Sequence, residues 1–484
     1  MHDRSASVAP PLVVGFDLDM TLVDARAGIA SSWRALSAET GVPVDTELVV
    51  SRLGPPVEAE AAHWFPAASV ASVATRYREI YREQAATAVE AMPGAHEALA
   101  AVRRHRGSTL VVTAKHEPNA RLNVEAVGLD LDDLVGDLWA EAKGHALSAK
   151  GATVYVGDHV HDVLGARVAG ATAVAVATGP CTASELSAVG ADVVLHSLAD
   201  FPAWLDEHLL AVRLAALEEQ LSCLGSVVVA FSGGADSAFL LAAAVRAVGA
   251  DRVVAATAYS DSLPMAERGP AADFAASLGV RQVTPRTNEM RREGYRANAG
   301  DRCYFCKAEL VEVLTPIADE LGLSAVVTGT NADDAVAGFR PGIRAAAERG
   351  AVTPLRDAGL TKEQVREASR RWGLPTWDKP AAACLSSRIA YGIEVTPHRL
   401  ARVERAEAAL RTALDRLGIA TGNLRVRDLA GTASIEVDAA VSGSVAASAD
   451  ARDAVLAAGF DRVEVDHRGF RSGSMNELLS AADG

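Results

Sequence analysis

Two acidic residues near the N-terminus, Asp17 and Asp19, have the spacing of a carboxylate pair that could share one catalytic site. They follow Leu12–Phe16, an apolar run that predicts a buried parallel strand. Ligand sites of open α/β sheets lie at the carboxyl ends of such strands. One carboxylate could attack a substrate while the other moves a proton and a cation neutralises the pair. A lone Asp-x-Asp pattern is weak evidence, so the other strand ends decide its meaning.

Polar residues at the ends of further predicted strands could join the same site. The apolar run that starts at Thr109 ends in the hydroxyl residue Thr113. The run that starts at Val154 is followed by Asp158 and Asp162. A lysine lies in the polar stretch between them. These additional candidates are Thr113, Lys143, Asp158 and Asp162.

In order along the chain, these residues resemble the four motifs of the haloacid dehalogenase (HAD) phosphatase superfamily. The resemblance to phosphoglycolate-phosphatase-like members covers roughly residues 11–208. It implies that Asp17 is the nucleophile that becomes an aspartyl-phosphate, and that Asp19 is the general acid/base. It also implies that Thr113 and Lys143 hold the phosphoryl oxygens.

The same resemblance implies a Mg²⁺ site, because Mg²⁺ suits a hard environment of carboxylates and phosphate. Its ligands would be Asp17, the backbone carbonyl of Asp19, Asp158 and Asp162.

The helical pattern of residues 25–93 predicts a small cap. Lys150 is the alternative to Lys143, being closer to the next strand, although Lys143 fits the usual spacing better. A degenerate scaffold kept for packing or partner binding is the alternative to an active phosphatase of unknown substrate.

A second site is predicted at Ser232–Ser237, where an apolar run ends in a glycine turn and a helical pattern begins. Glycines let the backbone approach an anion, and the first N–H groups of a helix point at it. The Walker spacing of kinases and GTPases is absent. A plain strand-to-helix turn is the alternative interpretation. The candidate anion-binding residues are Ser232, Gly233, Gly234, Asp236 and Ser237, with Asp236 also a candidate Mg²⁺-facing carboxylate.

Three cysteines lie in segments that suggest chemistry: Cys303 and Cys306 form a C-x-x-C pair, and Cys384 lies further along the chain. A structural zinc site would need a fourth Cys or His in reach, and there is no companion C-x-x-C. A redox disulfide would lack a thioredoxin-like context. An iron–sulfur cluster held by three thiolates, or Cys384 acting alone as nucleophile or sulfur source, are the other interpretations.

The elements that must position these residues alternate between apolar strands and helices. This rhythm continues after the second site and predicts doubly wound parallel sheets with helices on both faces. The expected fold class is therefore α/β: a HAD-like domain with a small helical cap, an adenine-nucleotide-hydrolase-like domain and a small C-terminal α+β domain. These three domains are expected over residues 1–208, 209–394 and 395–484.

The C-terminal domain is predicted to begin with a helix at Pro397–Leu417 and to continue with two strand–helix units. Arg425 and Arg427 alternate along a predicted strand and so lie on one face of it. A neighbouring strand should bring Glu436 into range. Paired arginines suit the phosphate of a mononucleotide, whereas a solvated strand face is the alternative interpretation.

Several motifs of residues 209–484 resemble, in their order, those of the LarE-type ATP-dependent sulfur transferases of the PP-loop ATP pyrophosphatase superfamily. They are Ser232–Ser237, Arg302–Lys307, Gly329–Asp334, Phe339–Gly342, Pro354–Arg356, Trp377–Ile389 and Gly469–Glu477. The resemblance implies that ATP adenylates a carboxylate of a small nucleotide substrate, a pyridinium biscarboxylate mononucleotide. Sulfur then displaces AMP, giving a thiocarboxylate for a nickel-pincer cofactor. The resemblance also assigns Arg425 and Arg427 to anion binding.

The source of the sulfur is left open between two routes. In single-cysteine relatives the residue matching Cys384 gives up its own sulfur and becomes dehydroalanine. In three-cysteine relatives a [4Fe–4S] cluster carries a transferable sulfide, and the presence of Cys303, Cys306 and Cys384 favours this route. Another PP-loop adenylating enzyme, a tRNA thiolase or an amide-forming ligase, is the alternative function. A catalytically silent scaffolding protein is the alternative of another class.

The composition limits which binding partners and which cellular compartment we expect for this protein. A net charge of −15 over 484 residues argues against a large nucleic-acid interface. Because no apolar run could span a bilayer and no signal-peptide pattern is present, we expect a cytoplasmic protein without membrane or nucleic-acid partners. The LarE resemblance implies a homo-oligomer, with pathway partners for nickel insertion and pyridine carboxylation. Cys181 and Cys223 are expected to be ordinary buried thiols.

Overall fold

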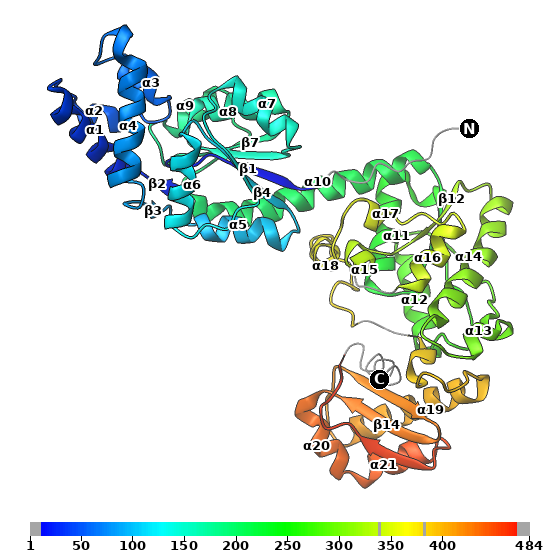
Figure 1. The fold of residues 1–484 in the computed structure, drawn as a ribbon. Coiled ribbons are helices and arrows are strands. Elements are labelled where there is room, and N and C mark those ends of the chain that lie inside the picture. Colours follow the sequence, from blue (N-terminus) through cyan, green and yellow to red (C-terminus); the bar gives the residue numbers. More distant parts are fainter. Residues whose placement is uncertain (1–10, 337–339, 381–383, 472–484) are drawn as a thin grey trace. The chain divides into compact units, whose positions relative to one another are not determined.

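The computed structural model of the chain describes residues 11–336, 340–380 and 384–471 (Figure 1). Parts of three motifs lie outside the described residues: Phe339, residues 381–383 and residues 472–477. The chain separates into two compact units, the first ending at Leu209 and the second beginning at Leu210. Among the described residues, no helix combines the length and apolar composition that crossing a membrane requires.

The first unit is built on a six-stranded sheet in which every neighbouring pair of strands is parallel. In spatial order its strands are β5 (Asp133–Val135), β4 (Ser108–Val112), β1 (Val13–Phe16), β6 (Val154–Gly157), β7 (Thr172–Val176) and β8 (Val193–Leu195). Successive side chains point to opposite faces, so Val156 packs into one hydrophobic cluster and Tyr155 into another.

Helices cover both faces of this sheet (Figure 1). One face packs against α5 (Ala95–Arg104), α6 (Glu117–Ala126) and the start of α10 (Phe201–Leu224). The other face packs against α7 (Glu141–Ala149), α8 (Val160–Ala169) and α9 (Ala183–Ala188). The doubly wound α/β fold predicted for this part of the chain is thus confirmed.

A helical cap lies between β2 (Val23–Asp24) and β3 (Glu90–Ala91), two short strands that pair antiparallel to each other. The cap contains α1 (Arg26–Thr40), α2 (Thr46–Val50), α3 (Val57–Ala61) and α4 (Val70–Gln84). Helices α1 and α4 meet through Trp33 and Tyr77, whose ring centroids are 4.8 Å apart. These rings belong to the same hydrophobic cluster as one face of the sheet, so the cap packs on the core through them.

The second unit contains a four-stranded parallel sheet: β11 (Arg281–Val283), β10 (Val253–Ala256), β9 (Val227–Ala230) and β12 (Ala325–Thr328). One face packs against α11 (Ala235–Val248), α12 (Arg268–Ser277) and α18 (Lys362–Arg371). The other packs against α14 (Arg302–Glu320). Shorter helices in the connections are α13 (Glu293–Arg296), α15 (Ala332–Val336), α16 (Pro341–Glu348) and α17 (Pro354–Asp357).

The C-terminal part of the second unit is α+β, but its element order differs from the two strand–helix units that the sequence predicts. After α19 (Pro397–Arg416), strands β13 (Leu424–Leu429) and β14 (Thr432–Val437) form a hairpin. The hairpin turn uses Ala430 and Gly431, both with positive φ. Two successive helices, α20 (Ala439–Ala447) and α21 (Ala449–Leu456), then precede β15 (Arg462–Val465), which pairs parallel to β14.

Candidate active sites

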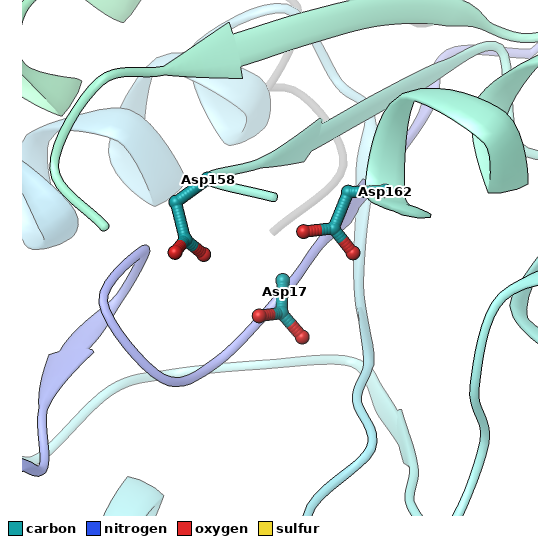
Figure 2. Close-up of side chains that lie close together, drawn as sticks. All are labelled: Asp17, Asp158 and Asp162. Carbon is teal, nitrogen blue, oxygen red and sulfur yellow. The ribbon is translucent and has the colours of Figure 1, made fainter. Parts of the chain in front are cut away.

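Three buried carboxylates meet at the carboxyl edge of the first sheet (Figure 2). Asp17 follows β1, Asp158 follows β6, and Asp162 lies in the first turn of α8. One carboxylate oxygen from each lies within 4.8 Å of the others. The parallel pairing of β1 with β6 causes this meeting, because both strands end at the same edge.

Lys143, from α7, is the cation that contacts this cluster. Its Nζ donates to Asp17 Oδ1 at 2.8 Å and to Asp162 Oδ1 at 2.6 Å, and only 2% of its side chain is exposed. Burial opposes its charge, but Asp162 and Asp17 hold the pKa of Lys143 well above its usual value. The alternative lysine, Lys150, instead forms an ion pair with Asp133 on the surface.

The acidic cluster carries more negative charge than Lys143 neutralises. Burial raises the pKa of Asp17, and burial together with the charges of Asp17 and Asp162 raises the pKa of Asp158 well above its usual value. Carboxylate oxygens are the ligands that Mg²⁺ prefers. The donor set therefore fits a divalent cation, which when bound would neutralise the cluster and polarise a phosphoryl oxygen.

The remaining polar atoms around Asp158 and Asp162 fix both carboxylates in place. Thr21 Oγ1 donates to Asp158 Oδ1 at 3.1 Å. A Cβ at Gly179 would lie 1.7 Å from Asp158 Oδ2, so this close approach requires glycine. The backbone N–H of His159 donates to Asp162 Oδ2 at 3.1 Å as part of a capping box.

Asp19 and Thr113 line the same cavity as Asp17 and Asp158, together with Lys115, which sequence reasoning missed. Lys115 Nζ donates to Asp19 Oδ1 at 2.8 Å and lies 4.4 Å from the centre of the Tyr81 ring. Thr113 is buried, and its Oγ1 accepts the backbone N–H of Lys115 at 3.3 Å. The available signal was that Lys115 follows Thr113 by two residues at the same strand end.

In the second unit, the predicted phosphate loop joins β9 to α11. Gly233 has φ 74°, and Gly234 is the N-cap of α11 without a side-chain cap, which leaves the first N–H groups of the helix for a ligand. Ser237 Oγ donates to the carbonyl of Gly234 at 3.1 Å and lies 3.1 Å from Ser232 Oγ. These bonds hold the loop as a backbone cradle for an anion.

Asp236 points toward the neighbouring strand end. Its Oδ2 accepts from Asn331 Nδ2 at 3.3 Å, while its Oδ1 is buried and has no hydrogen-bond partner among the described residues. Burial raises the pKa of Asp236. A bound cation would satisfy this orphaned oxygen.

A cavity of about 500 Å³ lies over this loop. Its volume falls in the range of about 300–1,000 Å³ that is usual for small-molecule sites. The phosphate loop and two of the three candidate cysteines, Cys306 and Cys384, line the same cavity. Cations also line it: Lys307, Lys362, Arg366 and Lys379. The cavity thus combines anion-binding groups with thiols.

The three cysteine thiols influence one another electrostatically, and Arg302 interacts with two of them, Cys303 and Cys384. Burial, followed by the influence of Cys384, raises the pKa of the Cys303 and Cys306 thiols. Burial opposes the charge of Arg302, but Cys384 and Cys303 raise its pKa. Arg302 Nη1 donates to the carbonyl of Ser386 at 2.7 Å, which ties the C-x-x-C helix to the Cys384 segment. All three cysteines are free thiols, the ligand type that iron–sulfur clusters use.

The other two cysteines differ from the expectation of ordinary buried thiols. Cys181 is half-buried and Cys223 is exposed. Leu217 and Leu221 occupy the buried face of α10. Cys223 follows Leu221 by two residues, which places it on the opposite side of the helix.

The C-terminal arginines lie on β13, as expected from their alternation. Arg427 Nη2 forms a buried ion pair with Glu436 Oε2 at 2.7 Å, and Arg427 Nη1 donates to the carbonyl of Ser387 at 2.9 Å. Burial and the neighbouring Arg388 lower the pKa of Arg425 to about 10. Arg388 Nη1 donates to the carbonyl of Cys384 at 3.1 Å. This group of arginines therefore adjoins the Cys384 segment.

Comparison with known proteins gives matches for both units. Residues 14–167 match the haloacid dehalogenase-like hydrolase family, and residues 135–201 match the HAD-hydrolase-like family. Uncharacterized protein slr1717 of Synechocystis sp. is 39% identical over 275 residues, which cover 56% of this chain and 100% of that protein. Pyridinium-3,5-bisthiocarboxylic acid mononucleotide synthase of Lactiplantibacillus plantarum is 35% identical over 274 residues, covering 56% and 97%. Probable phosphatase IndB of Dickeya dadantii is 32% identical over 219 residues, covering 39% and 91%.

The burial of Lys143 generates a stability prediction. Lys143→Met should lower the free energy of unfolding of the first unit by about 3–5 kcal/mol, because it leaves buried carboxylates without their cation. The matched control Lys150→Met, which breaks an exposed ion pair, should cost about 0–1 kcal/mol. Hydrogen exchange of peptides from β1 and β6 across a urea titration would measure both effects. Equal losses in the two variants would contradict the structural role of Lys143.

Proposed function

The chain belongs to the LarE-type family of pyridinium-3,5-bisthiocarboxylic acid mononucleotide synthases, with a HAD-type hydrolase domain in its N-terminal half, and from this premise we propose two activities. The second unit is an ATP-dependent sulfur transferase, and the first is a phosphohydrolase. The observation that carries the sulfur-transferase proposal is the cavity that Cys306 and Cys384 line together with the phosphate loop.

In the proposed sulfur transfer, the loop at Ser232–Ser237 binds the phosphates of ATP through backbone N–H groups. A carboxylate of a pyridinium biscarboxylate mononucleotide attacks the α-phosphorus and pyrophosphate leaves. The resulting acyl adenylate has a good leaving group, so sulfur attacks the carbonyl carbon and AMP departs. Asp236 would hold Mg²⁺ beside the phosphates, and Lys379, whose Nζ donates to the carbonyl of Gly233 at 2.9 Å, would neutralise charge at the loop.

We propose that Arg425 and Arg427 of β13 bind the phosphate of the substrate. Arg425 is half-buried, and because burial and the neighbouring Arg388 lower its pKa, an anion bound beside it would favour its charged form. Arg427 is oriented by Glu436 and by the carbonyl of Ser387. Because Ser387 lies three residues after Cys384, a phosphate held there would place the rest of the nucleotide near the thiol.

For the sulfur source we propose a [4Fe–4S] cluster bound by Cys303, Cys306 and Cys384. Three thiolate ligands would leave one iron of the cluster open, and that iron could bind an additional sulfide, provided by a sulfide donor, for transfer. The chain's own contribution is the buried Arg302, whose positive charge partly offsets the rise that burial causes in the pKa of the Cys303 thiol. The sacrificial use of Cys384 is the alternative.

For the first unit we propose phosphate-ester hydrolysis with Asp17 as nucleophile. Lys143 and Thr113 would hold the phosphoryl oxygens, and Asp19 would give a proton to the leaving group and then take one from water. Lys115 orients Asp19 through their 2.8 Å contact. Asp17, the Asp19 carbonyl, Asp158 and Asp162 would hold Mg²⁺, and Asp162 also orients Lys143 through their 2.6 Å contact.

A tRNA thiolase or amide-forming ligase is the second candidate for the C-terminal unit. The net charge of −15 weighs against RNA as substrate. Thionucleoside analysis of tRNA incubated with the protein, ATP and a sulfur source distinguishes the two.

The adenylation proposal predicts pyrophosphate release that depends on the pyridinium biscarboxylate mononucleotide. Asp236→Ala should lower this release by about 100-fold or more, since it removes a carboxylate beside developing negative charge and its cation. The matched control Asp251→Ala changes an exposed aspartate away from the loop and should leave the rate unchanged. An assay of total phosphate after treatment with added inorganic pyrophosphatase measures the release in both variants. Release that persists in Asp236→Ala would contradict the proposed site.

The cluster proposal predicts iron, labile sulfide and charge-transfer absorption in protein purified without oxygen. Cys303→Ala should lose all three signals, whereas Cys223→Ala, which removes an exposed thiol outside the cavity, should keep them. Iron-free protein whose turnover converts Cys384 to dehydroalanine by mass spectrometry would establish the sacrificial route instead.

The phosphatase proposal predicts Mg²⁺-dependent release of phosphate from acetyl phosphate by the full-length protein. Asp17→Asn should abolish the release because an amide cannot act as the nucleophile. Removal of Mg²⁺ by a chelator should also abolish it. The absence of Mg²⁺-dependent hydrolysis of every phosphate ester tested would support a degenerate scaffold.

A further inference from the structure

The cavity in front of Asp17 is small, and both aromatic and charged side chains line it. Its volume is about 100 Å³, whereas sites for ligands of drug or nucleotide size usually measure about 300–1,000 Å³. Core and cap both line it, and its wall includes Trp33 and Tyr77 as well as charged residues. This volume favours a substrate smaller than a mononucleotide, with a compact leaving group.

Three cations line the cavity in addition to the catalytic groups: Arg52 and Arg78 from the cap, and Lys115 from the core. Arg52 Nη2 donates to Glu60 at 2.6 Å, and Arg78 Nη2 donates to Glu58 at 2.6 Å. These glutamates fix one end of each guanidinium. The cap thus brings two oriented arginines to the cavity that holds the nucleophile.

Among the described residues, each arginine also has one buried N–H donor without an acceptor. The Nε atoms of Arg52 and Arg78 are buried and have no hydrogen-bond partner among the described residues. Buried donors are normally satisfied, so such atoms beside a cavity indicate that a ligand supplies the acceptors. Guanidinium groups prefer phosphate and carboxylate oxygens. The leaving group is therefore anionic as well as small.

A compact phosphate compound with an anionic leaving group is a product of the chemistry proposed for the other unit. We propose that the first unit hydrolyses inorganic pyrophosphate, the by-product of adenylation in the second unit. The identification of the source rests on the proposed function, while the cavity's preference for a small anionic leaving group stands on its geometry. Hydrolysis of pyrophosphate removes a product of adenylation and so draws the reversible step forward.

The reaction balances with the groups present. An oxygen of Asp17 attacks one phosphorus, the bond from that phosphorus to the bridging oxygen breaks, and phosphate leaves with a proton from Asp19. Arg52 and Arg78 stabilise the leaving phosphate. Water then attacks the aspartyl-phosphate, Asp19 takes the proton, and a second phosphate leaves. One pyrophosphate and one water give two phosphates, with no oxidant or reductant.

The direct test compares substrates for the full-length protein with Mg²⁺. Pyrophosphate should have a higher kcat/KM than AMP, phosphoglycolate or acetyl phosphate. Arg78→Gln and the conservative Arg78→Lys should lower kcat/KM for pyrophosphate by about 10- to 100-fold, since each loses hydrogen bonds to a charged leaving group. Acetyl phosphate lacks a second phosphoryl group, so its hydrolysis should change little and reports that the variants are folded. The matched control Arg76→Gln, whose ion pairs with Glu39 and Glu79 lie outside the cavity, should leave both reactions unchanged.

A preference for AMP or phosphoglycolate over pyrophosphate would overturn the proposal, as would equal losses on pyrophosphate and acetyl phosphate in Arg78→Gln. A turnover experiment separates this failure from failure of the sulfur transferase proposal. During ATP-dependent turnover, wild-type protein should release phosphate and AMP in a two-to-one ratio, and Asp17→Asn should release pyrophosphate and AMP in equal amounts. If AMP forms but pyrophosphate accumulates with wild-type protein, only the pyrophosphatase proposal fails. If added pyrophosphate is hydrolysed but no AMP forms, only the sulfur transferase proposal fails.

Discussion

The parallel pairing of β1 with β4 on one side and β6 on the other is the constraint on which the first site depends. Parallel strands that share a register end at one edge, so residues distant in sequence become neighbours there. Asp17 and Asp158 are brought so close that their charges can be buried only with a cation between or beside them. Lys143 supplies part of that charge, and its burial follows from the same need. The second unit repeats the plan, with β9 between β10 and β12.

The part of both sites that follows strand ends could be predicted from sequence, because an apolar run followed by polar residues is a local pattern. The residues that reach these sites from distant parts of the sequence could not be predicted in this way. Lys115 pairs with Asp19 across 96 residues of sequence. Arg52 and Arg78 reach the cavity only because the cap folds over the sheet edge. A helical pattern indicates which face of a cap helix is apolar, but it does not show which polar residue meets a distant nucleophile.

The C-terminal part shows a similar limit for element order. Alternation on β13 correctly placed Arg425 and Arg427 on one face and brought Glu436 opposite them. The expected strand–helix repetition was wrong because a positive-φ turn at Ala430–Gly431 allows an immediate hairpin. Around the cysteines, the decisive contact is also nonlocal: Arg302 connects its helix to Ser386. Spacing of cysteines alone contains no information about that bond.

Asp162 occupies two structural roles at once, since one oxygen accepts from Lys143 and the other completes the cap of α8. Its retention in a diverging lineage would therefore say little about catalysis, because loss of a helix cap alone costs about 0.5–2 kcal/mol. Asp17 and Asp158 have no such second use in the described structure, and each is costly to bury. Replacing Asp17 would remove a partner of the buried Lys143, whereas replacing Asp158 with an apolar residue would remove a carboxylate whose charge is costly to bury. Asp158 is thus a better indicator of phosphate chemistry in this fold than Asp162.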